Sequence, residues 1–420
     1  MTRTLSARDV RAALLVRREL ALIDLRSEAE FARAHPLFAS QVTSAELTRE
    51  APLRLPRRDV LVVLYDDGEG LVEAAAESLR GQGYTEVYAL EHGLSGWRNA
   101  GLELFQDVNS YSKAFGELVE ARRHTPSLAA EELQALIAQG ADIAIVDARR
   151  FDEYNTMSIP TSTSVPGAEL VLRARALAPR PETTIVVNCA GRTRSIIGTQ
   201  SLLNAGVPNK VVALRNGTIG WTLAGQQLET RQTRRVEQVA PTLAREARER
   251  AREVAYRAGV RWIGARELAL LSDDASRTLY RFDVRTPEEY AAGHLPRFRG
   301  APGGQLVQET DMFAPVRGAR IVLSDLGSAD AGESLGVRAD MTASWLAQMG
   351  WEVLVLEGPV PDARETSELA PPPVRTAAGR YRRPYEGTDN PRAAMQAYLE
   401  WEYGLVAQLA RDATHGFFVL

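Results

Sequence analysis

The 420-residue sequence contains only one cysteine, Cys189. A single thiol excludes an intramolecular disulfide, so nothing points to an oxidising compartment. It also excludes the cysteine pairs of common zinc sites, and the five histidines are scattered along the chain. We therefore expect no metal site.

Long apolar runs and a strong excess of charge are also missing. The net charge is −4, which gives no electrostatic reason to expect nucleic acid or an anionic membrane as a partner. Charged residues interrupt every apolar run before about 18 residues, and the first residues lack the apolar core of a signal peptide. These absences predict a cytoplasmic protein that binds neither nucleic acid nor membrane.

What the sequence does contain is an internal repeat. Residues 23–31, 146–154 and 282–290 each carry Asp-x-Arg near the start and a glutamate followed by an aromatic residue at the end. Residues 90–97 and 214–221 share a second element that ends in Gly-x-x-Gly-Trp. The copies recur at the spacing of small domains, so we expect three similar units.

Short runs rich in Val, Ile and Leu alternate with helical patterns inside each unit. In the first unit the pattern predicts a helix at 6–18, strands at 21–24, 60–64 and 86–90, and a helix at 71–82. Such alternation is typical of an α/β fold with a central parallel sheet and helices on both faces. The predicted fold class is therefore α/β, with three tandem modules and a helical tail at the C-terminal end.

We predict six segments along the chain. They are a first unit at 1–104, a helical connector at 105–126, a middle unit at 127–230, a charged helical connector at 231–258, a third unit at 259–366, and a Pro-rich linker with a helical tail at 367–420. Because the charges of the second connector alternate in sign, we expect it to be a solvated helix. The tail has apolar residues at helical spacing over 393–411, which predicts a helix that packs on one of the domains.

Cys189 lies where a predicted strand at 185–187 meets a predicted helix that begins near Ser195. The N-terminus of that helix supplies partial positive charge and free N–H groups. Arg192 and Arg194 add two full positive charges. Charged side chains are rare in an apolar core, which disfavours the alternative that Cys189 is only a buried apolar residue. These features favour the thiolate, so we expect the pKa of Cys189 to lie below the free value of ~8.5.

Together these segments resemble the rhodanese family. The Asp-x-Arg element, the strand followed by a cysteine loop and a helix, and the closing Gly-x-x-Gly-Trp stand in the order usual for that family, and the resemblance reaches to about residue 366. The middle unit departs from the family at 155–160, where a Gly-His-Ile-Pro turn is usual. The resemblance implies α/β modules that carry sulfur as a cysteine persulfide.

The resemblance also implies a thiosulfate sulfurtransferase that needs no cofactor. Cys189 is then the nucleophile, which takes sulfane sulfur from a small anionic donor such as thiosulfate and gives it to a small thiol, cyanide or a protein acceptor. The residues expected to hold the donor are Ala190, Gly191, Arg192, Thr193, Arg194 and Ser195, with the two arginines on its sulfonate oxygens. We expect Asp147 and Arg149 to form a buried pair that supports the fold. The oligomeric state stays open.

The first and third units lack a thiol. An alignment without gaps places Tyr65 at the cysteine position of the first unit, and the matching strand places Asp325 there in the third, whose loop at 326–338 is about eight residues longer. We therefore expect both units to be non-catalytic and to scaffold or present an acceptor. We expect the middle unit to form a persulfide by itself.

Two other functions remain open. A sulfur carrier or redox-sensing interaction protein with little turnover would also explain two units without a thiol. A phosphatase of the same fold is the other, although such enzymes usually have Cys-x5-Arg, whereas Cys189 and Arg194 are separated by four residues. The shorter loop favours a pocket for sulfur over one for phosphate.

Overall fold

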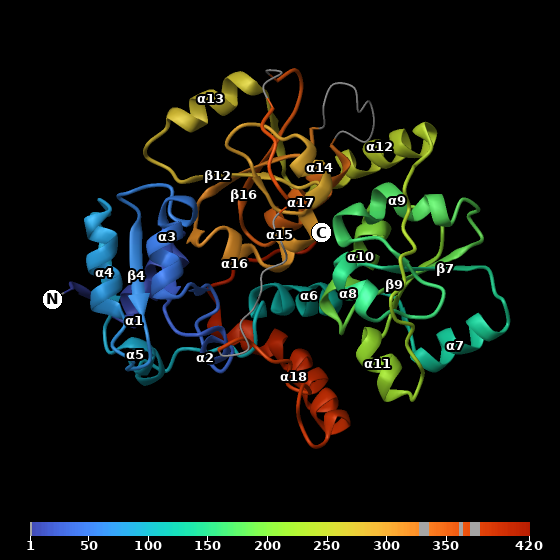
Figure 1. The fold of residues 1–420 in the computed structure, drawn as a ribbon, viewed down its shortest axis with the longest axis horizontal. Coiled ribbons are helices and arrows are strands. Elements are labelled where there is room, and N and C mark those ends of the chain that lie inside the picture. Colours follow the sequence, from blue (N-terminus) through green and yellow to red (C-terminus); the bar gives the residue numbers. More distant parts are fainter. Residues whose placement is uncertain (1, 327–335, 361–363, 370–378) are drawn as a thin grey trace.

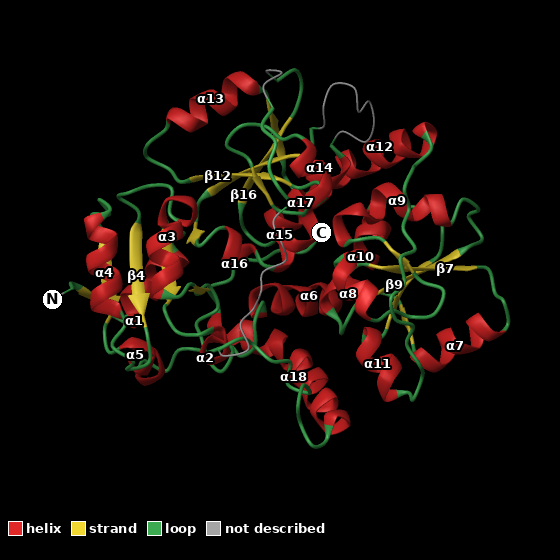
Figure 2. Ribbon diagram, in the orientation of Figure 1, coloured by secondary structure: helices red, strands yellow, loops and turns green. Residues whose placement is uncertain are grey.

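The computed structural model describes residues 2–326, 336–360, 364–369 and 379–420. The proline run of the predicted linker and most of the long loop expected in the third unit lie outside the described residues. The described part forms three separate sheets, each flanked by helices (Figures 1 and 2). The predicted α/β class with three modules is confirmed.

The first module is built around a mainly parallel sheet in the order β1-β5-β4-β2, with β3 also paired to β2. Its strands are β1 (Thr4–Leu5), β2 (Leu20–Asp24), β3 (Ser40–Gln41), β4 (Leu61–Tyr65) and β5 (Val87–Leu90). Its helices are α1 (Ala7–Leu15), α2 (Glu28–Phe31), α3 (Ser44–Arg54), α4 (Val72–Gly81) and α5 (Gly93–Asn99). The predicted strands are correct to within a residue at each end. The first helix ends earlier than predicted, before Arg17, whose positive φ of 55° takes the backbone out of the helix.

The middle and third modules repeat this strand order as β6-β10-β9-β7-β8 and β11-β16-β15-β12-β13. The middle module comprises β6 (Ser127–Leu128), α7 (Ala130–Ala138), β7 (Ile143–Asp147), α8 (Phe151–Thr156), β8 (Thr163–Ser164), η1 (Gly167–Glu169), α9 (Leu170–Leu177), β9 (Thr184–Asn188), α10 (Thr193–Asn204), β10 (Val211–Leu214) and α11 (Gly217–Leu223). The third comprises β11 (Arg261–Ile263), α13 (Ala265–Asp273), β12 (Leu279–Asp283), α14 (Pro287–Ala292), β13 (Arg299–Gly300), α15 (Gly303–Gln308), α16 (Thr310–Phe313), β14 (Val316–Arg317), β15 (Arg320–Ser324), α17 (Val337–Gln348) and β16 (Glu352–Leu356).

The first and third modules share a sheet edge. Strand β14 of the third module pairs antiparallel with β2 of the first, with Val316 opposite Ala21 and Arg317 opposite Leu20. Buried residues of both modules also belong to one continuous hydrophobic core. These two modules are therefore joined by backbone hydrogen bonds as well as by packing.

Helix α12 (Pro241–Arg257) corrects the expectation of a solvated connector. Its small side chains Ala244, Ala247 and Ala251 are buried together with Val254, and the helix packs on α17 and α9. Alanines at helical spacing let neighbouring helices approach closely, while the alternating charges occupy the opposite face. The prediction was wrong because it considered only the alternating charges of this segment and not the apolar residues on the opposite face of the helix.

Two further helices pack on each other next to the middle module. Helix α6 (Ser110–Arg123) runs between the modules in Figure 1 and packs on α10, α15 and the tail helix α18 (Pro391–Asp412). The tail helix therefore packs back on the molecule as predicted. Both helices approach the loop that follows β9.

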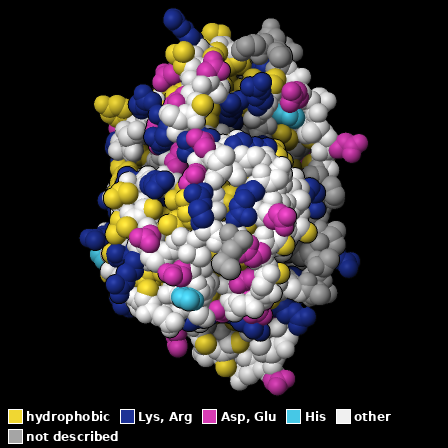
Figure 3. Space-filling view, turned by 90° about the vertical axis from the view of Figure 1, so that its left-hand side faces the viewer, with side chains coloured by type: hydrophobic (Ala, Val, Ile, Leu, Met, Phe, Trp, Pro, Cys, Tyr) yellow, Lys and Arg dark blue, Asp and Glu magenta, His cyan; other side chains and the backbone are white. Residues whose placement is uncertain are grey.

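Acidic and basic side chains are interspersed over the face on the side of the first module (Figure 3). This distribution agrees with the small net charge of −4. Within the described ranges, none of the helices has the length and apolar character needed to cross a membrane.

Candidate active site

Cys189 directly follows β9, a strand buried in the centre of the middle sheet, and precedes α10. The predicted strand and helix around it are thus confirmed. The carbonyl of Cys189 accepts a hydrogen bond from the N–H of Thr218 at 2.9 Å, and a Cβ on Gly217 would stand 2.3 Å from the same carbonyl oxygen. Only glycine fits there, which explains why the Gly-x-x-Gly-Trp element accompanies the cysteine loop.

Cys189 is 1% exposed, and its sulfur lies against Ser195. The thiol donates to the Ser195 hydroxyl oxygen at 3.5 Å, and that hydroxyl donates to the carbonyl of Arg192 at 2.8 Å. Burial raises the pKa of the thiol, while the charge of Arg194 and hydrogen bonds from Ser195 act in the opposite direction. The expected lowering of the pKa is therefore wrong for this closed site, because the sequence did not show how completely the sulfur is removed from water.

Arg192 does not project freely toward the sulfur. Its guanidinium donates to both carboxylate oxygens of Glu117 in α6, at 2.7 and 2.8 Å, and to the hydroxyl of Tyr403 in α18 at 3.0 Å. The guanidinium also lies over the Tyr403 ring, 4.1 Å from its centroid. Two helices from outside the middle unit thus hold this arginine.

Arg194 is engaged in the same way, but within the module. It donates to Glu153 of α8 at 2.6 and 3.1 Å. In the third module, which has no thiol, Arg338 pairs with Glu289, which occupies the same place in the repeat as Glu153. Since the pair recurs without the sulfur, it supports the loop in both modules. The sequence predicted that Arg192 and Arg194 bind the sulfonate of the donor, but both guanidinium groups are paired with carboxylates of the protein.

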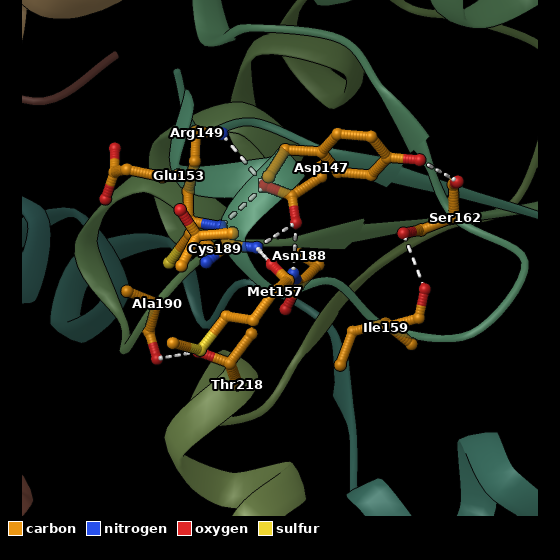
Figure 4. Close-up of polar contacts among 12 residues, drawn as sticks. Asp147, Arg149, Glu153, Met157, Ile159, Ser162, Asn188, Cys189, Ala190 and Thr218 are labelled. Atoms are coloured by element: carbon orange, nitrogen blue, oxygen red, sulfur yellow. Dashed lines mark hydrogen bonds and ion pairs between the residues drawn. The ribbon is translucent and has the colours of Figure 1, made fainter. Parts of the chain in front are cut away.

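Asp147 and Arg149 form the expected buried pair at 2.7 Å, and Asn188 donates to Asp147 at 2.7 Å (Figure 4). Arg149 also donates to the Met157 carbonyl at 2.6 Å, which ties α8 to the strand end. The equivalent pairs of the first and third modules, Arg26–Asp24 and Arg285–Asp283, each measure 2.6 Å. Their presence in all three modules assigns them to the fold.

Two of the remaining loop residues, Gly191 and Thr193, contact helices outside the middle module, whereas Ala190 contacts α11 within it. A Cβ on Gly191 would lie 3.4 Å from a carboxylate oxygen of Glu402 in α18. Thr193 packs on Gly116 of α6, where an added Cβ would stand 2.8 Å from the Thr193 methyl group. The carbonyl of Ala190 accepts from the hydroxyl of Thr218 at 3.1 Å (Figure 4). The cysteine loop is therefore covered by α6 and α18.

A family model for the rhodanese-like domain matches residues 7–100 and 129–224. The crystal structure of a thiosulfate sulfurtransferase from Pseudomonas aeruginosa is 49% identical to this chain, covers 100% of both chains, and superposes with a TM-score of 0.93. The chain belongs to the rhodanese family. The solution structure of a rhodanese-like domain from Anabaena sp. is 24% identical and matches 27% of this chain and 89% of its own, with a TM-score of 0.23.

The first rhodanese module requires a correction at the cysteine position. Asp24 pairs with Tyr65 across β2 and β4, just as Asp147 pairs with Asn188 across β7 and β9. Tyr65 therefore matches Asn188, and Asp66 takes the place of the cysteine. The alignment without gaps slipped by one residue because the first module is one residue shorter between its helix α4 and its strand β5 than the middle module is between α10 and β10. In the third module, the register of β12 and β15 confirms Asp325.

Both aspartates fill the anion-binding cradle of their own loops. Asp66 accepts from the N–H groups of Gly68 at 3.1 Å and Leu71 at 2.6 Å. Asp325 accepts from those of Gly336 at 2.6 Å and Arg338 at 3.0 Å. In both loops a carboxylate thus accepts hydrogen bonds from the backbone N–H groups.

Sequence reasoning missed four side chains that lie next to the cysteine loop, Glu117, Tyr398, Glu402 and Tyr403. They come from α6 and α18, and only tertiary packing brings them to the loop. The apolar spacing of the tail predicted its packing, but no local pattern indicated which module it covers. The described residues contain no cluster of three or more His, Cys, Asp or Glu side chains suited to a metal ion.

Proposed function

We propose that this protein is a sulfurtransferase that carries sulfane sulfur on Cys189 as a persulfide. The observation that carries the proposal is the placement of the chain's one thiol at the N-terminus of α10, with Ser195 hydrogen-bonded to it. The full-length likeness to a thiosulfate sulfurtransferase supports the same chemistry and favours thiosulfate as a donor.

In the first half-reaction, the Cys189 thiolate attacks the outer sulfur of thiosulfate. A bond forms between the two sulfurs, the sulfur–sulfur bond of thiosulfate breaks, and its electron pair leaves with sulfite. An acceptor nucleophile, either a small thiol, cyanide or a protein thiol, then attacks the outer persulfide sulfur and restores the thiolate. Backbone N–H groups of residues 190–195 stabilise the persulfide anion at the helix N-terminus.

The charged groups around the loop shape this reaction indirectly. Since Arg192 and Arg194 are paired with carboxylates, they position the loop, and the backbone donors bind the anion. The first and third modules, with Asp66 and Asp325 in place of the thiol, serve as non-catalytic scaffolds. A lone free thiol suits the reducing cytoplasm, where we place the reaction.

Intact mass after incubation with thiosulfate tests the proposal. We expect a gain of one sulfur atom in the wild type and none in Cys189→Ser, which should also lose thiosulfate:cyanide sulfurtransferase activity while remaining folded. Transfer well above background in Cys189→Ser would rule out the mechanism.

The burial of Cys189, at 1% exposure, favours a second candidate, a sulfur carrier with little turnover. Both functions predict the persulfide, but they differ in steady-state rate. A sustained rate with thiosulfate and cyanide supports the enzyme, whereas one stoichiometric loading followed by slow release supports the carrier.

A further inference from the structure

Glu402 on the tail helix is a buried acid without a full set of partners. It is 1% exposed, and its Oε1 accepts a hydrogen bond from the Tyr398 hydroxyl at 3.2 Å. Its Oε2 is a buried atom with no hydrogen-bond partner in the described part of the chain. That same oxygen is the atom nearest to the open face of Gly191, at 3.4 Å from where a Cβ would stand.

The cations near Glu402 are already committed to other acids. Lys113 of α6 pairs with Asp107 at 2.9 Å, and Arg192 of the cysteine loop pairs with Glu117 at 2.7 Å. Ionised Glu402 would thus be a buried charge without its own counter-ion, a costly arrangement. Burial raises the pKa of Glu402 to about 7, and Glu117 adds to this, while Lys113, Arg192 and the Tyr398 hydrogen bond oppose it.

We propose that Glu402 of α18 acts as a neutral carboxylic acid at the cysteine loop, where its free Oε2 donates a hydrogen bond to an anionic sulfur donor. This inference rests on the proposed function, because the anion is the donor or the sulfite that leaves from it. Since Oε1 already accepts from Tyr398, the proton resides on Oε2, which faces Gly191. When Glu402 loses that proton, its negative charge repels the donor.

The pH dependence follows from the groups that face Glu402. These are Lys113 and Glu117 from α6, Arg192 from the loop, Tyr398 from α18 itself, and Tyr385 from the segment before it. Helix α11, which also packs on α18, brings no charged residue. Because burial raises the pKa of Glu402 to about 7, selection for anions should weaken as the pH rises through about 7.

Because Cys189 is the only thiol, alkylation reports this selection without any sulfur transfer. The ratio of the rates with anionic iodoacetate and neutral iodoacetamide is measured by intact mass between about pH 6 and 8, since the ratio cancels the ionisation of the thiol itself. A unit charge close to a buried site should lower the ratio by at least roughly threefold across this range. Glu402→Gln, which keeps a hydrogen-bond donor and cannot ionise, should hold the ratio at the low-pH value of the wild type.

Glu400→Gln is the matched control, since Glu400 is exposed on the same helix and should leave the fall in the ratio unchanged. A flat wild-type ratio, or a fall that persists in Glu402→Gln, would overturn the inference. The same samples are loaded with thiosulfate. If the alkylation ratio behaves as expected but no persulfide forms, the proposed function fails while anion selection by Glu402 stands.

Discussion

The ion pair between Arg194 and Glu153 is the residue-scale feature that most changes how the cysteine loop is understood. Both side chains are largely buried, with 18% and 14% exposure. Arg194→Ala would leave the Glu153 carboxylate with only the longer ion pairs to Arg150 at 3.7 Å and Arg383 at 3.6 Å. The loss of its charged hydrogen bonds should cost roughly 1.5–3 kcal/mol in the free energy of unfolding. Because the arginine then acts on the loop and not on the donor, kcat/KM should fall by similar factors for thiosulfate and for a neutral persulfide donor. Steady-state kinetics with both donors, together with urea unfolding, checks this.

The pH dependence of stability supplies an independent control for this pair. Burial alone would raise the pKa of Glu153, but the charge and hydrogen bonds of Arg194 lower it to about 2. A carboxyl whose pKa is lower in the folded state stabilises the protein above the unfolded pKa and loses that contribution as the pH falls. The stability difference between wild type and Arg194→Ala should therefore shrink between about pH 5 and 2. A loss confined to anionic donors would instead assign the guanidinium to donor binding.

Single residues also show what the sequence could and could not predict. Cys189 and the Asp147–Arg149 pair were identified because their roles are local: one follows a strand, and the other spans three residues. The predicted cysteine position of the first module was one residue too early. Whether Tyr65 or Asp66 takes that position depends on the strand register, which the sequence alone does not reveal. The pKa of the thiol was predicted in the wrong direction because desolvation depends on distant helices.

At the scale of elements, the close approach of α6 to the start of α10 holds the loop. A Cβ on Gly116 would overlap the methyl group of Thr193 at 2.8 Å. Gly116→Ala should therefore push the two helices apart, cost about 1–3 kcal/mol of stability, and slow persulfide formation. Thermal unfolding and single-turnover loading with thiosulfate measure the two effects.

Gly404→Ala on α18 is the comparison for that substitution. An added Cβ there meets no atom within 4 Å, so the change should be neutral or stabilise the helix by about 0.5–1 kcal/mol. If Gly116→Ala proved as stable and as fast as Gly404→Ala, α6 would not constrain the loop. The sequence predicted α6 as a helical connector, but the glycine that lets this helix touch the site is visible only in the packing.

At the scale of the whole molecule, the active site draws on three parts of the chain that lie far apart in sequence. The middle module supplies Cys189 and its loop, α6 supplies Glu117, and the tail supplies Glu402 and Tyr403. The repeat predicted three modules, because each copy carries its own pattern. It could not predict that the connector and the tail complete one site, since nothing in either segment repeats. The expectation that the middle unit forms a persulfide by itself stays a prediction, and the contacts from α6 and α18 lead us to expect a slower rate for it than for the full chain.

The contribution of the connector is measured by comparing residues 127–230 with residues 105–230 and with the full chain. Without α6 and α18, Arg192 loses its contacts with Glu117 and Tyr403 and becomes exposed to solvent, so the loop should open. We expect residues 127–230 to load sulfur from thiosulfate at least roughly tenfold more slowly than the full chain, the equivalent of about 1.4 kcal/mol. Restoring α6 in residues 105–230 should recover part of that rate, because Glu117 returns while Glu402 and Tyr403 do not. Circular dichroism separates a slow fragment from an unfolded one. Loading by a folded 127–230 fragment at the rate of the full chain would show that the middle module needs neither helix.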